Sequence, residues 1–343
     1  MSRAWPGGFL LVAVLVGLAC APIAADATFP GHNGEIAYVD LEGVGSDSET
    51  VTDLIQVCAG GFHERDLLPG TSWDTGPVVF SPNGRTAATS GIAIAAVTGK
   101  RQRRVSRPPR RASDAGPVWS PKGGALAFTR VRYARGDRVR STAVRIYANG
   151  QGRFLTRGFA PAWSARDQIA FLRGDIDDTT THEVHVASLK TGAVRRLATG
   201  YAPDWSPDGR RLVFSYRPPG ETFGPNLEPL VEVVTIRADG TGLRRLARGD
   251  GASWSPDGRR IAFLAPEGYV AVVSPSGRRL RRLARSNTAP LFSPDSRWLA
   301  YTWKDELYVV SVKTGRRRWV TSPSEEMELL DWRAAPASET RCR

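Results

Sequence analysis

The chain of 343 residues is 41% hydrophobic and 24% charged, a composition that excludes an intrinsically disordered tail. Its 47 Lys and Arg exceed its 34 Asp and Glu, and the formal net charge of +13 favours an acidic partner or an anionic surface. Only 3 Cys and 4 His are present, too few for a cysteine-rich zinc module or an iron–sulfur cluster. The 35 Gly, 24 Pro and 10 Trp favour many short strands joined by tight turns.

The first 27 residues have the pattern of an export signal. Arg3 gives a positive start, residues 9–19 form an apolar run, and Ala25-Asp26-Ala27 is a small-x-small cleavage site. The mature chain is therefore expected to begin at Thr28. Because the run is shorter than the roughly 20 residues that span a bilayer, no transmembrane helix is expected.

Cys20 offers a competing hypothesis, a lipid-modified cysteine. Gly17 stands three positions before it, where a branched apolar residue is usual, so cleavage after Ala27 is favoured. We expect the protein to be secreted, periplasmic or associated with the cell envelope. Export would place Cys58 and Cys342 in an oxidising compartment, where they can pair.

An aromatic-Ser-Pro-Asp-Gly phrase, followed by a short apolar strand, recurs along the mature chain. A degenerate copy lies at residues 29–34 and a bare Leu330-Asp331-Trp332 closes the series. Successive aromatic anchors are 39, 44, 42, 49, 38 and 40 residues apart, the spacing of four-stranded propeller blades. The anchors are Phe80, Trp119, Trp163, Trp205, Trp254, Phe292 and Trp332.

Each repeat predicts four strands. A first strand follows the Ser-Pro-Asp-Gly turn, and a second strand is rich in β-branched residues. A third strand of the Arg-Arg-Leu-Ala kind alternates basic and apolar residues, which predicts an outer edge, and the stretch before the next anchor is the innermost strand. The first strands are expected at 36–39, 126–128, 169–171, 212–214, 261–263 and 299–301, and second strands at 183–187, 231–236, 269–273 and 307–312.

The sequence resembles the TolB-type, WD40-like β-propeller repeat proteins over nearly all of residues 29–332. Residues 205–214 and 254–263 carry the specific phrase Trp-Ser-Pro-Asp-Gly-Arg-Arg, then Leu or Ile, Val or Ala, and Phe. The resemblance implies a propeller used mainly for binding, without implying a shared ligand. Nothing here resembles the N-terminal α/β domain of TolB, so the cell-envelope partners of TolB are not carried over.

The predicted fold is all-β, a single propeller over residues 28–333 followed by a tail at 334–343. Units opening at residues 34, 84, 123, 167, 209, 258 and 296 predict seven four-stranded blades. Six is the alternative, because the TolB propeller has six and the first unit is irregular. The strand at 328–332 is expected to join the blade of residues 36–39 and close the ring without a free edge.

Closure also predicts a disulfide. The innermost strand and the strand before Cys58 should end on the same face of the ring. The ten residues after the last strand reach about 33 Å when extended, whereas two strand spacings need only about 10 Å. We therefore expect Cys58 to pair with Cys342.

Catalytic motifs are absent from the sequence. It contains no Gly-x-Ser-x-Gly elbow, no phosphate-binding Gly-x-x-x-x-Gly-Lys loop and no His-Glu-x-x-His. On a strand, His182 and His185 fall on opposite faces and cannot share a metal, so we interpret them as surface histidines. No metal site, cofactor or enzymatic activity is expected.

Arginines on the outer strands and in residues 100–111 carry the positive charge. They could hold the protein on anionic phospholipid or a phosphate-bearing wall polymer. The favoured alternative is a solvated, repulsive edge that prevents aggregation of a monomeric propeller. Because base-stacking motifs are missing, no nucleic-acid partner is expected.

Acids and aromatics gather in the segments that precede each innermost strand, where a propeller forms the mouth of its central channel. Aromatic faces beside carboxylates suit sugars or cationic groups. Alternatively, Asp and Asn occur there because they form turns. The candidate ligand-binding residues are Trp73, Asp74, Asp114, Phe159, Tyr201, Asp250, Asn287 and Glu326.

Two functions remain open. The favoured one is a non-catalytic exported propeller that binds an unidentified envelope protein or glycan. The alternative is an enzyme that cleaves envelope polysaccharide or peptide with carboxylates from the mouth, since a glycosidase needs only two suitably spaced acids.

Overall fold

A computed structural model describes residues 29–42, 51–61, 65–66, 78–97, 102–218, 231–322, 326–335 and 342. These residues are almost entirely β-strand and turn, with one short 3-10 helix, η1 (Thr179–Thr181). The all-β prediction is therefore confirmed. The predicted export signal, with Cys20, lies outside the described residues. Within the described part, no helix has the length and apolar character needed to cross a membrane.

The described strands form six antiparallel sheets, five of four strands and one of seven. In order of hydrogen-bonded neighbours, the first three are β27 (Glu326–Ala335), β1 (His32–Glu42), β2 (Val51–Cys58) and β3 (Arg65–Asp66); β4 (Val79–Phe80), β5 (Thr86–Thr89), β6 (Ala93–Ala96) and β7 (Gln102–Arg104); and β8 (Ala112–Trp119), β9 (Ala125–Tyr133), β10 (Val139–Ala148) and β11 (Gln151–Arg157). The others are β12 (Phe159–Trp163), β13 (Gln168–Arg173), β14 (Glu183–Ser188), β15 (Val194–Trp205), β16 (Arg211–Tyr216), β17 (Glu232–Arg237) and β18 (Arg244–Arg248); β19 (Asp250–Trp254), β20 (Ile261–Ala265), β21 (Tyr269–Val273) and β22 (Arg281–Arg285); and β23 (Leu291–Phe292), β24 (Trp298–Trp303), β25 (Glu306–Ser311) and β26 (Arg317–Thr321).

The seven-stranded sheet arises because one strand serves two repeats. Residues 194–199 of β15 pair with β14, and residues 200–205 pair with β16. The first half has the Arg-Arg-Leu-Ala sequence predicted for an outer strand, and the second half ends at the anchor Trp205. β15 therefore runs from the outer edge of one group of strands to the inner edge of the next.

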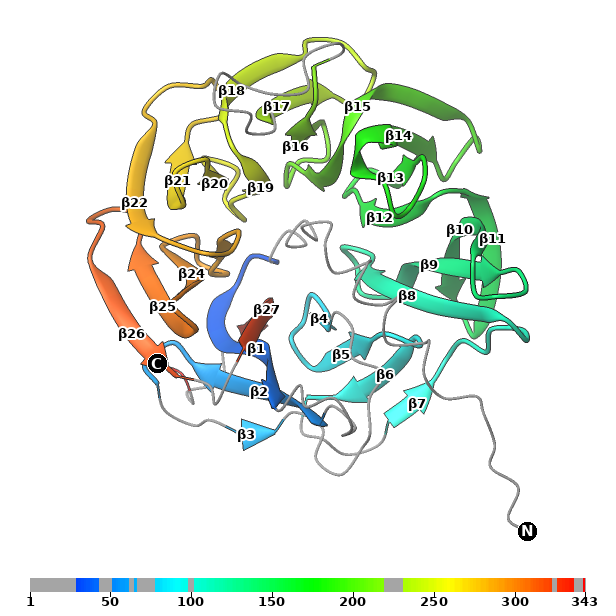
Figure 1. Ribbon diagram of the computed structural model, residues 1–343, viewed down its shortest axis with the longest axis horizontal. Helices are drawn as coiled ribbons and strands as arrows, with labels where there is room; N and C mark the ends of the chain where they lie inside the picture. Colours follow the sequence, from blue (N-terminus) through cyan, green and yellow to red (C-terminus); the bar gives the residue numbers. More distant parts are fainter. Residues whose placement is uncertain are drawn as a thin grey trace.

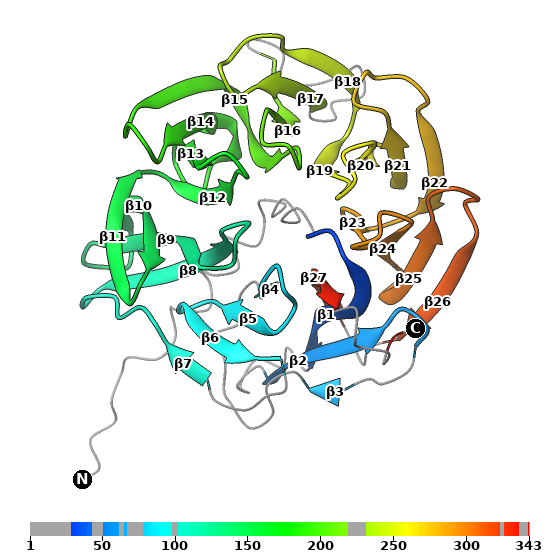
Figure 2. The same ribbon diagram turned by 180° about the vertical axis from the view of Figure 1, so that it is seen from behind.

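The sheets are arranged around a common centre, with strands such as β12, β19 and β27 near it and β11, β18, β22 and β26 at the rim (Figure 1). The view from behind shows the same order (Figure 2). The arginine-rich strands are thus the outer ones, as their alternating pattern predicts.

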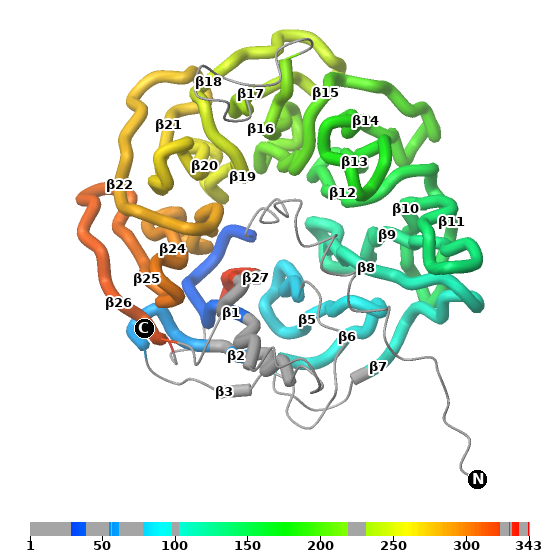
Figure 3. Tube along the Cα trace, viewed as in Figure 1, coloured from blue at the N-terminus to red at the C-terminus, as the bar shows by residue number. Residues whose placement is uncertain are grey.

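The last strand pairs with the first. β27 runs antiparallel to β1, with Trp332 opposite Ile36, and Figure 3 shows these two strands side by side. The buried guanidinium of Arg333 in β27 pairs with Glu35 in β1, with 2.6 Å between Nε and Oε2, and also donates to the main-chain oxygen of Gly84. β27 continues to Ala335, two residues past the predicted boundary of the propeller.

Successive residues of an inner strand pack against opposite neighbours. In β16, Leu212 and Phe214 belong to a core with Phe159, whereas Val213 packs with Trp254 of the following sheet. Because side chains alternate along a strand, a sheet covered on both faces must be apolar at every position. This explains the uninterrupted apolar runs that mark these strands in the sequence.

The Ser-Pro-Asp-Gly turn satisfies its own polar groups. Ser206 Oγ donates to Asp208 Oδ1 at 2.7 Å and accepts from the Arg211 main-chain N–H at 3.0 Å. Gly209 N donates to Ser206 O, with Gly209 at φ +65°. The same contacts recur at Ser81, Ser255 and Ser293. The acidic side chain of the phrase is therefore a structural part of the turn.

A disulfide joins Cys58, the last residue of β2, to Cys342, across 284 residues of sequence and with 5.3 Å between the Cα atoms. It links the pair of cysteines that the sequence analysis selects, and it ties the end of the chain to the sheet that contains β1 and β27.

Candidate functional site

The innermost strands define two faces of the ring. We call the side where these strands begin the mouth face. Phe159 and Asp250 are the first residues of β12 and β19, and Tyr201 is the second residue of the inner half of β15. We call the opposite side, which carries the Ser-Pro-Asp-Gly turns, the turn face.

Tyr201 and Asp250 are brought together on the mouth face. The Tyr201 hydroxyl donates to Asp250 Oδ2 at 2.7 Å, and Ser215 Oγ donates to Oδ1 at 2.6 Å. The main-chain N–H of Gly251 also donates to Oδ1. Burial, together with the adjacent carboxylate, raises the pKa of the Tyr201 hydroxyl, so it remains a donor. Both oxygens of Asp250 are thus engaged within the protein.

Arg217 and His182 lie close to this pair. The Arg217 guanidinium carbon is 5.3 Å from the centre of the Tyr201 ring, and its Nη2 donates to Thr179 Oγ1 at 3.0 Å. His182 donates through Nε2 to the main-chain oxygen of Asp175 at 2.7 Å. Burial lowers the pKa of His182, which favours the neutral ring.

Asp114 makes a buried ion pair inside its own sheet. Arg130 contacts it in a bidentate manner, at 2.6 Å from Nε to Oδ1 and 2.7 Å from Nη2 to Oδ2, and Ser106 Oγ donates to Oδ2. The carboxylate side chain is fully buried. These contacts place Asp114 in the interior, where it holds residue 106 against β8 and β9.

The other candidate residues are distributed around the ring. Phe159 is buried and packs edge-on against His182, with 5.0 Å between the ring centres. Asn287 is exposed, and its Oδ1 accepts from the Lys304 main-chain N–H. Glu326 is the first residue of β27. Trp73 and Asp74 lie outside the described residues.

The interpretation of His182 and His185 as surface residues is wrong. Their exposed fractions are only 1% and 5%. His185 stacks on Phe171 and its Nε2 lies 3.1 Å from Glu183 Oε2. The sheet is covered on both faces, so strand alternation gives neither histidine a solvent-facing position. Within the described ranges, His, Cys, Asp and Glu side chains do not gather in threes as a metal site needs.

A cavity of about 740 Å³ opens on the turn face, where the β12–β15 and β15–β18 parts of the seven-stranded sheet meet. Five arginines and two aspartates line it, together with small apolar residues such as Val186 and Ala193. The charged lining residues are Arg166, Arg195, Arg210, Arg211, Arg237, Asp208 and Asp239. We call this the arginine pocket.

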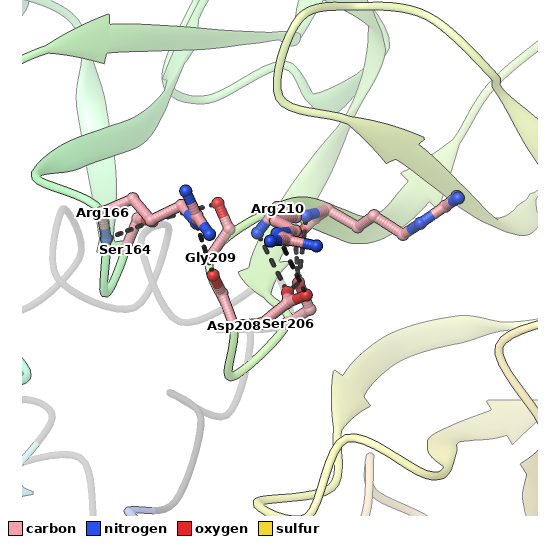
Figure 4. Close-up of polar contacts among 7 residues, drawn as sticks. Ser164, Arg166, Ser206, Asp208, Gly209 and Arg210 are labelled. Carbon is pink, nitrogen blue, oxygen red and sulfur yellow. Dashed lines mark hydrogen bonds and ion pairs between the residues drawn. The ribbon is translucent and has the colours of Figure 1, made fainter.

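Arg166 crosses from one turn to the next (Figure 4). Its Nε donates to the main-chain oxygen of Asp208 at 2.9 Å, while Ser164 Oγ accepts from the Arg166 N–H. Arg195 likewise donates to the main-chain oxygen of Asp239. Both guanidiniums are held by bonds to neutral carbonyl oxygens, and the carboxylates of Asp208 and Asp239 act on them through longer-range attraction.

The arginine pocket was missed by sequence reasoning, although a signal was present. In the phrase Trp163-Ser164-Ala165-Arg166-Asp167, arginine stands where the regular repeats have the Asp of the turn. Such a departure removes a carboxylate and adds a cation at the same point of the ring.

No family model and no curated protein matches the chain. Among solved structures, TolB from Acinetobacter baumannii is 20% identical with a TM-score of 0.50, over 76% of this chain and 66% of TolB. An oligogalacturonate lyase in complex with manganese is 13% identical with a TM-score of 0.61, over 93% and 90% of the two chains. A puromycin-hydrolyzing peptidase of Mycobacterium tuberculosis is 16% identical with a TM-score of 0.62, over 95% of this chain and 56% of the peptidase.

The fold is that of a β-propeller. TolB-like propellers are among its structural neighbours, as the repeat resemblance implies, and propeller enzymes are among them too. At these identities the likeness is one of fold alone, and the propeller of this chain spans about two thirds of TolB and about half of the peptidase.

Proposed function

We propose that the protein is an exported, non-catalytic β-propeller that binds a ligand or partner in the cell envelope or outside the cell. The observation that supports this most directly is the state of Asp114 and Asp250, the two candidate carboxylates whose side chains the structure describes. Asp250 accepts from Tyr201, Ser215 and the Gly251 N–H, and Asp114 is paired with Arg130. A general acid or nucleophile needs an oxygen available to substrate, and these oxygens are occupied.

The proposal includes seven blades, with residues 194–199 of β15 ending one blade and residues 200–205 starting the next. The ring would be closed by the pairing of β27 with β1, and the disulfide between Cys58 and Cys342 would reinforce this closure covalently. The sheet order and the register of Trp332 opposite Ile36 support this count and closure.

An activity panel tests the non-catalytic assignment. The purified protein is incubated with oligogalacturonate, cell-wall glycan fragments and aminoacyl or peptide substrates, and products are measured by mass spectrometry. We expect no turnover. Turnover that Asp250→Asn or Asp74→Asn abolishes would instead establish the alternative, an envelope polysaccharide- or peptide-cleaving enzyme.

The export step is tested separately. The N-terminus of the protein recovered from the envelope or medium is expected at Thr28, after removal of residues 1–27. An N-terminus at Cys20, with release from the membrane by Cys20→Ala, would show that the protein is lipid-anchored.

A further inference from the structure

We propose that the arginine pocket is a binding site for a small ligand that carries two or more carboxylate or phosphate groups. The inference rests on the proposed binding function and adds the site and the ligand class. The volume of about 740 Å³ is within the range of small-molecule sites, and the lining has a net charge of +3.

The guanidiniums keep most of their donors available. Each guanidinium has five N–H groups, whereas the bonds within the protein use Nε of Arg166, Nη1 of Arg195 and Nη1 of Arg237, which lies 3.3 Å from Thr241 Oγ1. The remaining N–H groups can form the paired, charge-assisted hydrogen bonds that arginine makes to carboxylate and phosphate.

The two aspartates of the pocket offset only part of this charge. Asp239 Oδ1 accepts from the main-chain N–H and hydroxyl of Thr241, and these bonds lower the pKa of Asp239, with smaller contributions from Arg237 and Arg195. Asp208 Oδ1 is held by Ser206 and the Arg210 N–H, and the nearest ion-pair distance from Asp208 to Arg210 is 3.9 Å. Both carboxylates therefore accept hydrogen bonds from residues of their own turns.

Two arginines face each other directly. Arg211 of β16 and Arg237 of β17 are partners in the antiparallel ladder. Like charges at opposite positions of a ladder destabilise a sheet, and an oxyanion between them would reverse that effect. The next sheet along the chain has the same turn, and Arg260 is its counterpart of Arg211. The counterpart of Arg237, opposite Arg260, is Ser274, which directly follows β21. In the groove one repeat later, Asp208 occupies the turn position that Arg166 occupies in the arginine pocket.

This neighbouring groove supplies a matched control. The pocket variant Arg211→Gln/Arg237→Ser removes two positive charges and places at 237 the residue type found at 274. The control variant Arg259→Gln/Arg260→Gln removes two positive charges from the corresponding turn one repeat later. The two proteins have equal net charge, so non-specific attraction of anions weakens equally in both.

Calorimetric titration with trigalacturonate and, separately, with inorganic pyrophosphate measures binding at low and at physiological ionic strength. We expect at least one probe to bind the wild-type protein, with affinity falling about tenfold or more in the pocket variant and within about twofold of wild type in the control. Preference between the probes tells whether carboxylate or phosphate is recognised.

Failure to bind either probe below about 1 mM, or equal loss in both variants, would overturn the pocket assignment. These outcomes are distinct from failure of the proposed function, which shows as turnover that depends on Asp250 or Asp74. Thermal unfolding of both variants without ligand establishes that the substituted proteins are folded.

Discussion

The mouth face and the turn face of this propeller satisfy their charged groups in opposite ways. On the mouth face, Asp114 and Asp250 are surrounded by Arg130, Tyr201 and Ser215, at distances of 2.6–2.7 Å. On the turn face, the guanidiniums of Arg166 and Arg195 donate to main-chain oxygens, and the carboxylate of Asp208 accepts a hydrogen bond within its own turn. The mouth face thus engages its carboxylates in internal hydrogen bonds and one ion pair, whereas the turn face leaves most guanidinium N–H groups available, so the turn face is the better candidate for recognising an anion.

The largest effect is expected at the buried ion pair of Asp114. Asp114→Ala leaves the Arg130 guanidinium buried without its partner and should lower the free energy of unfolding by about 3–5 kcal/mol, measured by urea denaturation. Asp114→Ala/Arg130→Met removes both charges and should recover a substantial part of that loss. A single variant as stable as wild type would contradict the internal role of Asp114.

A second effect concerns Asp331, a carboxylate held by the main-chain N–H groups of Phe80 and Trp332. Burial raises its pKa from 3.8 to about 7. Between those values the folded protein keeps a proton that the unfolded chain has released, so this group makes stability fall as pH rises from about 4 to about 7. Thermal midpoints across this range should decline less steeply in Asp331→Asn; equal slopes in the two proteins would refute the raised pKa.

Tyr201→Phe tests the pairing of Tyr201 with Asp250 on the mouth face, and its effect on stability is expected to be smaller. It removes the hydroxyl that donates to Asp250 Oδ2 and leaves the donors to Oδ1 in place. We expect a loss of about 1–2 kcal/mol in the free energy of unfolding. Tyr269→Phe, at a half-buried tyrosine of β21 that stacks with Arg285, is the control and should change stability by under about 0.5 kcal/mol.

The smallest effect on stability is expected in the arginine pocket. Arg211→Gln relieves the repulsion with Arg237 across the ladder, so the free energy of unfolding should stay the same or rise by a few tenths of a kcal/mol. Urea denaturation at low salt measures it. A loss of more than about 1 kcal/mol would mean that Arg211 is a structural residue and would remove the contrast between the faces.

The repeat made most of the fold predictable. The second strand expected at 269–273 is β21, and the one expected at 183–187 is β14 to within one residue. Turn chemistry and apolar runs are local, so they are visible in the sequence. By contrast, the burial of His182 and His185 depends on a neighbouring sheet that covers the second face of their strand, and strand alternation alone carries no information about that neighbour.

The candidate site was predictable only in part. The position of acids and aromatics before each anchor predicted a common site, and Tyr201 does meet Asp250, whereas Asp114 is buried against Arg130 in its own sheet. The partners of those acids were not predictable, because Asp250 is bonded by residues 49 and 35 positions away. The arginine pocket combines residues of two repeats, and its volume exists only once the sheets are placed side by side.

The sequence by itself determined the strand order, the turns and the pair of cysteines, because each depends on residues close together or on the repeat period. Only the tertiary structure decided which charges are neutralised. Arg130 and Asp114 face each other across adjacent strands, whereas Arg211 and Arg237 face each other with like charge. Coulombic interaction depends on distance and burial, and neither quantity is encoded in the spacing along the chain.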